Sequence, residues 1–269
     1  MARRSATPAA TPSTPVDVRL MNAASTAVFV IAALTLLAAA VLWLTRVPWF
    51  GIRALQLEGD LARSNVATIR ANALPHLAGN FFSIDLQRAR QAFESVPWVR
   101  VAVVRRVWPD RLAVRLEEHR AVALWEGERG ETLLVNSHGE VFETNLGDVE
   151  DETLPVFEGP AGQSAVLWAM YQRLQPVLAR EEMAIARLVR SGRASWRIET
   201  DDGVLLELGR GSDDEVMARV ERFVRTLGQV TGHFGKPLLT ADLRHADGYA
   251  VRLQGVTTTP AAGSNPKGN

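Results

Sequence analysis

The chain has 269 residues, a length that favours two modest domains over one large domain. Hydrophobic residues make up 47% and charged residues 22%, which provides enough apolar material for packed cores and excludes a wholly disordered protein. Lys and Arg number 30, as do Asp and Glu, so the formal net charge is +0 and no overall charge attracts nucleic acid. The sequence contains no cysteine, which excludes disulfides, thiolate nucleophiles and cysteine-ligated metal sites.

A long apolar segment near the N-terminus predicts a membrane span. No charged residue occurs from Leu20 to Thr45, and Ala23 to Leu44 is an almost unbroken apolar run. At about 1.5 Å per residue this run measures roughly 33 Å, close to the thickness of the hydrocarbon core of a bilayer. A cleaved signal peptide is the alternative, but its apolar region extends over only about 7–15 residues. We therefore expect an uncleaved transmembrane helix over residues 23–45.

The charges beside the span favour one orientation only weakly. Arginines occur on both sides of it: Arg3, Arg4 and Arg19 before the span, and Arg46 and Arg53 after it. A short tail followed by a large folded part is the usual single-pass arrangement, because long domains cross the membrane largely regardless of charge. We expect a cytoplasmic N-terminus, a disordered tail at residues 1–22, and a membrane boundary marked by Trp43 and Trp49.

The segment after the span is typical of a β-α-α-β-β unit. Alternating apolar residues predict its strands, and apolar residues at helical spacing predict its helices. Asp85 is a good N-cap for the second helix, and Pro97 closes it. The expected elements are a strand at Ile52–Glu58, a helix from Ser64 and Asn65 to Pro75, a helix from Asp85 to Pro97, and strands at Val99–Val107 and Arg111–Glu117.

From Ala121 the pattern changes to short strands interrupted by two helices. The first expected helix is Ser164–Leu178, and the second is a long amphipathic helix that begins at Asp213. A β-hairpin around Ala246–Gly248 follows, and residues 257–269 are expected to be a disordered tail. The expected strands are Val122–Trp125, Thr132–Asn136, Val141–Thr144, Ala184–Val189, Ser195–Thr200, Val204–Leu208, Leu238–Arg244 and Tyr249–Leu253.

A search for catalytic chemistry finds no constellation that specifies a reaction. The histidines lack the spacing of a helical metal site and are interpreted as turn or surface residues: His76, His119, His138, His233 and His245. Gly209–Gly211 precedes a helix as phosphate loops do, but the acidic residues from Asp213 to Glu215 already cap that helix. Glu117 and Glu118 are adjacent, so their side chains diverge and cannot form a glycosidase pair. We expect no enzyme activity, no metal and no cofactor.

The last hairpin predicts an interaction surface. Only a polar tail follows it, so Tyr249–Leu253 is expected to be an edge strand with unpaired backbone N–H and C=O groups. Edges of this kind can accept a strand from another chain. Tyr249, Val251 and Leu253 are expected on one face of the strand and Arg252 on the other. The alternative is an edge that its charges and the tail keep closed to partners.

Several motifs, in this order, resemble the FtsQ/DivIB family of bacterial cell-division proteins. They are Val96–Trp125 with Trp-Pro-Asp, the hairpin Leu133–Phe142, Leu154–Pro160, Ser195–Gly211 with Leu-Gly-Arg-Gly, and Ala241–Gly248 with Asp-Leu-Arg. The first motif alone would indicate only a POTRA module, so a POTRA-containing transport or outer-membrane assembly factor is the alternative, and a membrane-tethered enzyme is a third interpretation. The resemblance implies an α+β fold with a POTRA domain at residues 50–119. A mixed β domain is implied at 120–256, with helices packed on a curved antiparallel sheet.

The resemblance also implies a function and a set of partners. FtsQ proteins are non-enzymatic single-pass scaffolds of the divisome at the septum, with periplasmic domains anchored in the cell inner membrane. They join FtsB and FtsL and help to connect them with FtsK, FtsW and FtsI; in the family, the last strand receives a strand from FtsB, assisted by basic residues. Matched motif by motif, the partner-binding positions here are Arg193, Arg244, His245, Gly248, Tyr249, Val251 and Leu253. Some relatives carry an aromatic residue at the positions of His245 and Leu253, so the pocket there is expected to differ.

Overall fold

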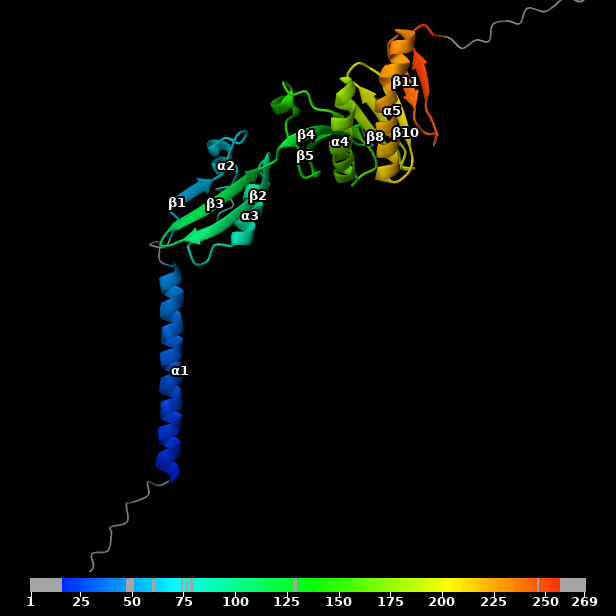
Figure 1. The fold of residues 1–269 in the computed structure, drawn as a ribbon. Coiled ribbons are helices and arrows are strands. Elements are labelled where there is room, and N and C mark those ends of the chain that lie inside the picture. The colour runs from blue at the N-terminus through cyan, green and yellow to red at the C-terminus, as the bar shows by residue number, and fades with distance from the viewer. Residues whose placement is uncertain are drawn as a thin grey trace, which may run out of the picture. The chain divides into compact units, whose positions relative to one another are not determined.

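The computed structural model describes residues 16–46, 51–59, 61–73, 75, 77, 80–127, 130–245 and 247–256 (Figure 1). By its internal contacts the chain divides into two compact units. The first comprises residues 1–59, 66–96 and 102–116, and the second comprises residues 60–65, 97–101 and 117–269. The expected domain boundary after residue 119 stays a prediction. The expected tail at 257–269, residues 1–15 of the N-terminal tail, and Trp49 lie outside the described residues.

Helix α1 (Val16–Arg46) is long and apolar enough to cross a membrane, judged by length and composition. Within Val16–Trp43, an 18-residue window has a mean hydropathy of 2.4, and none of that window is buried within the chain. The expectation of disorder up to residue 22 is wrong for residues 16–22, which are helical. Asp17 lies in the first turn, where a negative charge interacts favourably with the positive end of the helix dipole.

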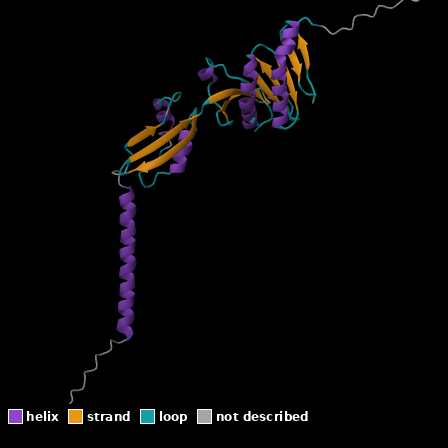
Figure 2. Ribbon diagram, in the orientation of Figure 1, coloured by secondary structure: helices purple, strands orange, loops and turns teal. Residues whose placement is uncertain are grey.

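Besides α1, the described part of the first unit contains a three-stranded sheet and two helices, in the predicted β-α-α-β-β order (Figure 2). The elements are β1 (Ala54–Glu58), α2 (Val66–Ala73), α3 (Leu86–Glu94), β2 (Val99–Val107) and β3 (Arg111–Glu118). The strands pair in the order β1-β3-β2, and β1 runs parallel to β3. Asp85 caps α3 as predicted, because its side chain accepts hydrogen bonds from the N–H groups of Gln87 and Arg88.

Within the described residues, the second unit is built on a nine-stranded sheet. Its strands are β4 (Ala121–Glu126), β5 (Thr132–Asn136), β6 (Val141–Phe142), β7 (Val156–Glu158), β8 (Ile185–Arg190), β9 (Trp196–Thr200), β10 (Leu205–Gly209), β11 (Leu238–Asp242) and β12 (Ala250–Leu253). They lie in the order β12-β11-β10-β9-β8-β7-β4-β5-β6. The predicted α+β class is confirmed.

The expectation of an antiparallel sheet is wrong, because β4–β7, β7–β8 and β10–β11 are parallel pairs. Parallel neighbours need a crossover connection, since a tight turn can join only antiparallel strands. Helix α4 (Ser164–Leu178) lies between β7 and β8 in the chain, and α5 (Asp213–Phe234) lies between β10 and β11. Both helices occur where the sequence predicts them and connect two of the three parallel pairs, whereas β5 and β6 lie between β4 and β7.

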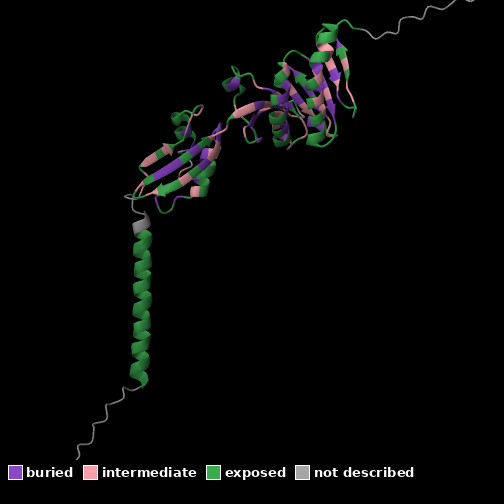
Figure 3. Cartoon of the chain, in the orientation of Figure 1, coloured by how far each residue is buried: buried purple, intermediate pink, exposed green. Residues whose placement is uncertain are grey.

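Helices α4 and α5 lie side by side over one face of the sheet (Figure 1), and the buried residues gather between them and the strands (Figure 3). Leu167 of α4 and Phe223 of α5 are completely buried, as is Ile198 of β9. Because side chains alternate along a strand, Arg197 and Glu207 lie on the opposite face, where they form an ion pair of 2.7 Å. At β9 and β10 the sheet therefore has one apolar, covered face and one charged face.

The N-terminus of α5 is capped by the chain itself, as predicted. The hydroxyl of Ser212 accepts a hydrogen bond from the N–H of Glu215, and the Glu215 carboxylate accepts one from the N–H of Ser212. This capping box satisfies two of the free N–H groups of the helix terminus. A phosphate would have to displace a carboxylate there.

Candidate functional site

Strand β12 is one edge of the nine-stranded sheet. It pairs antiparallel with β11, and no other described strand lies on its outer side. The N–H of Gln254, just past the strand, donates to the carbonyl of Pro237 on the β11 side. Because backbone directions alternate along a strand, the N–H groups of Arg252 and Ala250 point the same way, and that of Val251 points to the open edge. The predicted edge is confirmed, and the backbone N–H and C=O of Val251 face it without a partner strand among the described residues.

The side chains of β12 alternate as predicted. Val251 is half-buried and Leu253 is only 5% exposed, whereas Ala250 and Arg252 are exposed. Tyr249, just before the strand, is also half-buried and packs against the hydrophobic core. One face of the edge strand is therefore attached to the core, and the other faces solvent.

Tyr249 is held by helix α5. Its hydroxyl oxygen lies 2.6 Å from that of Thr226, and its ring meets the ring of Phe223 edge-on, with 5.2 Å between centroids. These contacts direct the aromatic side chain toward the fold. Tyr249 can therefore contribute to partner binding mainly by positioning the strand and through its backbone.

Arg244 lies at the end of β11 and forms a two-point ion pair with Asp242. Its Nε and Nη2 donate to the two carboxylate oxygens at 2.8 and 2.6 Å. The hydrogen bonds from the Arg244 side chain hold the pKa of Asp242 at about 2, well below its usual value. The carboxylate also accepts the backbone N–H of Arg244, so the arginine is fixed from two sides.

The Leu-Gly-Arg-Gly motif explains why Arg244 fits at this place. Gly209, at the end of β10, has φ +78, and a Cβ there would lie 2.9 Å from the Cγ of Arg244. The neighbouring Leu243 donates its N–H to the carbonyl of Glu207. A glycine at residue 209 therefore supplies both the backbone conformation and the space for the arginine stem.

The structure brings some of the predicted site residues together and separates others. Arg193 lies exposed in the turn before β9, and the start of β9 pairs with the end of β10, beside the end of β11. Arg193 and Arg244 therefore lie at the same end of the sheet. His245 and Gly248 are in the turn at that end, whereas Leu253 is buried at the opposite end of β12. The part of these residues in partner binding stays a prediction.

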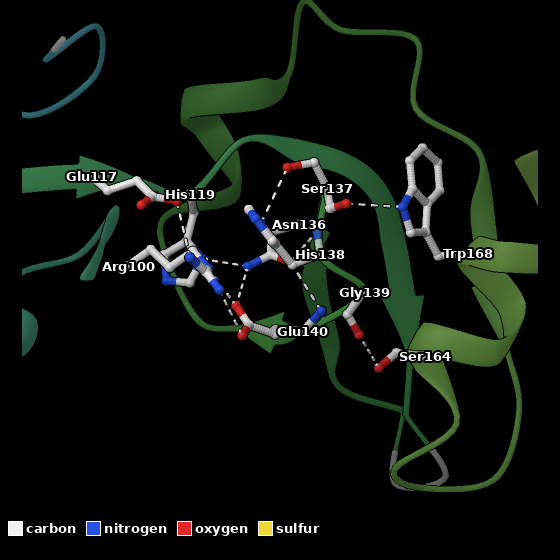
Figure 4. A network of polar contacts seen from close by, with 10 residues as sticks. All are labelled: Arg100, Glu117, His119, Asn136, Ser137, His138, Gly139, Glu140, Ser164 and Trp168. Atoms are coloured by element: carbon white, nitrogen blue, oxygen red, sulfur yellow. Dashed lines mark hydrogen bonds and ion pairs between the residues drawn. The ribbon is translucent and has the colours of Figure 1, made fainter.

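A second polar cluster, which we call the hairpin network, was missed from the sequence (Figure 4). At its centre is Asn136, a completely buried side chain. Its Oδ1 accepts the N–H groups of His138 and Glu140, while its Nδ2 donates to Glu140 and to Nδ1 of His119. All four hydrogen-bonding positions of the amide are therefore used, as burial of a polar group requires.

Charged residues complete the hairpin network. Arg100 donates through Nε and Nη2 to the two carboxylate oxygens of Glu140, at 2.8 and 3.2 Å, and through Nη1 to Glu117. The Arg100 side chain, and then Asn136, lower the pKa of Glu140 to about 2. On the other side of the hairpin, Trp168 of α4 donates its indole N–H to the carbonyl of Ser137 (Figure 4).

His119 departs from the expectation of a turn or surface histidine. Its ring stacks on Phe142 with 4.1 Å between centroids and an interplanar angle of 3°. Burial lowers the pKa of His119, which suits a neutral ring that accepts a hydrogen bond from Asn136. No local spacing signals these contacts, because the partners are 17 or more residues apart; the Asn-Ser-His-Gly turn is the only visible clue.

Comparison with known proteins identifies both parts of the chain. Residues 50–119 match the family model of the FtsQ-type POTRA domain, and residues 123–244 match that of the C-terminal part of cell division protein FtsQ/DivIB. The second match ends before β12, so the candidate edge lies outside it.

Curated relatives cover nearly the whole chain. Cell division protein FtsQ of Thiomonas arsenitoxydans is 41% identical over 90% of this chain and 89% of its own length. The proteins of the same name from Burkholderia pseudomallei and Bordetella pertussis are 37% and 34% identical, over 89% and 93% of this chain and 94% and 97% of theirs. The chain belongs to the FtsQ/DivIB family of cell division proteins.

Proposed function

We propose that this protein is a non-enzymatic scaffold of the division machinery at the septum, anchored in the cell inner membrane by α1. Membership of the FtsQ/DivIB family supports the role in cell division. The single observation that carries a binding function is the open edge of β12. In this proposal an extended segment of FtsB adds to β12 as a further strand, FtsL joins with FtsB, and the scaffold connects them with FtsK, FtsW and FtsI.

The backbone of β12 and the arginines at the end of the sheet have different roles in this proposal. Backbone pairing at Val251 supplies hydrogen bonds that depend little on the partner's sequence. Discrimination comes from charge, since Arg193 and Arg244 lie at the end of the sheet where β12 starts and attract carboxylates of an incoming segment. Arg193 is exposed, and no ion pair engages it among the described residues, whereas Arg244 must share its guanidinium with Asp242.

The proposed topology places the N-terminal tail in the cytoplasm and both domains in the periplasm. Helix α1 supports a single crossing by its length and composition. A scaffold with this arrangement can hold FtsB and FtsL on the same side of the membrane as its own domains.

A matched pair of substitutions at Val251 tests the proposal. In the full-length protein in nanodiscs, Val251→Pro should abolish FtsB binding at low and high salt, because proline removes the N–H at the open edge. Val251→Ala keeps that N–H and should retain most of the binding. Both variants should show the parental circular dichroism, since an outward-facing proline is tolerated on an edge strand. Parental FtsB affinity in Val251→Pro would refute strand addition at β12.

A further inference from the structure

Among the described residues that follow α1, the first unit exposes two large aromatic side chains at one end. Trp108, in the turn between β2 and β3, is 74% exposed, and Phe82, in the loop before α3, is 50% exposed. An isolated exposed apolar residue is ordinary, but burial of a tryptophan ring in a soluble core is strongly favourable. Tryptophan instead prefers the boundary between membrane and water, where an apolar ring and a polar N–H can both be accommodated.

Hydrogen bonds bring the loop that carries Phe82 and the turn that carries Trp108 to the same end of the unit. Arg106, near the end of β2, donates through Nη2 to the carbonyl of Ile84, so the loop that carries Phe82 adjoins the β2 end that leads to Trp108. The N–H of Arg53, just before β1, donates to the carbonyl of Asp110 in the Trp108 turn at 2.9 Å. Turn, loop and the entry to β1 therefore form one end of the unit.

Chain connectivity keeps this end close to α1. Helix α1 ends at Arg46, and Arg53 is bonded to the Trp108 turn. The residues between them can span at most about 25 Å even when fully extended, at roughly 3.6 Å each. The opposite end of β1, at Glu58, lies one strand length farther from the end of α1 along the chain. Whatever the path of the connection, the end with the exposed aromatic side chains is the one tethered beside the span.

The same end has an excess of positive charge. No carboxylate pairs with Arg53, Arg70 or Arg106 in the described part of the chain. Arg53 and Arg70 line a cavity of about 430 Å³ together with apolar residues: Ile52, Ala54, Leu55 and Leu77. Two guanidinium groups beside an apolar surface match the phosphate and the adjoining apolar part of a phospholipid.

We propose that this end of the POTRA unit docks on the phospholipid surface of the membrane that α1 spans. Trp108 and Phe82 enter the interfacial layer, and Arg53 and Arg70 contact lipid phosphates. This docking rests on one part of the proposed function, the crossing of the membrane by α1. It does not depend on the orientation of α1 or on the division partners. The short tether makes the contact intramolecular, so even a weak attraction is enough to populate it.

The absence of cysteine allows a direct test with one fluorescent label per molecule. A polarity-sensitive fluorophore is attached to Phe82→Cys, or to Val103→Cys as the control, in the full-length protein in nanodiscs of zwitterionic lipid with or without phosphatidylglycerol. Val103 is a suitable control because it is 56% exposed on β2 but lies away from the Trp108 turn. Lipids with a nitroxide in the headgroup region quench any fluorophore that reaches the membrane surface.

Docking predicts strong quenching at residue 82, a blue-shifted emission there, and little quenching at residue 103. Trp108→Glu should reduce the quenching at residue 82, and Arg53→Glu with Arg70→Glu should reduce it in discs that contain phosphatidylglycerol.

Equal quenching at the two positions, or quenching that Trp108→Glu leaves unchanged, would overturn the proposal. A blue shift at residue 82 that appears only after division partners are added would also overturn the proposal, since a protein and not lipid would then cover this surface. FtsB binding, measured on the same discs, should be unaffected by Trp108→Glu, so failure of docking is distinguishable from failure of the scaffold function.

Discussion

The hydroxyl oxygens of Tyr249 and Thr226 lie 2.6 Å apart, which ties the start of the edge strand to helix α5. The Thr226 hydroxyl also donates to backbone carbonyls of its own helix, so the pair belongs to an ordered network. An edge strand that must accept a partner benefits from such an anchor, because a pre-positioned strand loses less conformational entropy on binding.

Tyr249→Phe separates this anchor from the apolar contact with Phe223. It removes one hydrogen bond while leaving Thr226 with carbonyl partners, so unfolding free energy should fall by about 1 kcal/mol. FtsB binding should change little, because the ring contact with Phe223 still positions the strand. Tyr249→Pro should instead abolish binding at any salt and lower stability, because it also removes the core contact. Urea unfolding and FtsB titration measure the two effects, and a Tyr249→Pro variant that binds normally would exclude this end of the strand from the site.

The second prediction concerns charge at the sheet end. Arg244→Glu should weaken FtsB binding roughly tenfold at low salt and less at high salt, because it replaces an attraction with a repulsion. Asp242→Asn is the matched variant, since it keeps an oxygen acceptor for the backbone but releases the Arg244 guanidinium. It should retain or strengthen binding. If Arg244→Glu binds FtsB as the parent does, the basic residues at this end have no part in recognition.

Acid should weaken the hairpin network through Glu140. The pKa of Glu140 is about 2 in the folded protein and near 4.5 when unfolded, so its contribution is present above pH 4.5 and is lost as the pH falls toward 2. Half of the side chain is exposed, so we expect only about 1 kcal/mol. Glu140→Gln should lower stability at pH 7 and flatten the pH dependence between 4.5 and 2. Urea unfolding across this range tests it, and an unchanged slope would contradict the assignment.

Two glycines with nearly the same backbone conformation allow a controlled test of packing. Gly139 has φ +78, and a Cβ there would lie 2.5 Å from the Cα of Ala165, whereas Gly203 has φ +79 with open space around it. Gly203→Ala should cost about 1–2 kcal/mol of unfolding free energy from backbone strain alone. Gly139→Ala should cost about 1–3 kcal/mol more than Gly203→Ala, because the hairpin must also move away from α4. Equal losses would show that α4 does not restrain the hairpin.

Topology can be tested with reporters that act only after export. A fusion after Leu253 should be active and one at the N-terminus inactive, because a single span places the two ends on opposite sides of the membrane. The reverse pattern would show that the N-terminus is outside. The docking of the POTRA unit on lipid would still stand in that case, since it requires only that α1 crosses the membrane.

The sequence alone determined the elements, because local spacing and capping chemistry are enough to specify them. The bounds of β2, β5 and α4 match the prediction, and Asp85 caps α3 as predicted. The final hairpin, with an exposed edge and alternating faces, also followed from the residue pattern. These features depend on residues a few positions apart, so the spacing of apolar residues along the chain is enough to predict them.

Only the tertiary structure decided which elements meet. Three parallel pairs in the sheet, the stacking of His119 on Phe142, and the fit of Arg244 over Gly209 each join residues distant in sequence. No local pattern encodes such contacts, since they depend on how helices α4 and α5 cross between strands and on the register of every strand. For the same reason the sequence could name Arg193, Arg244, His245 and Leu253 as site residues, while the order and register of the strands placed the first three at one end of the sheet and Leu253 at the other.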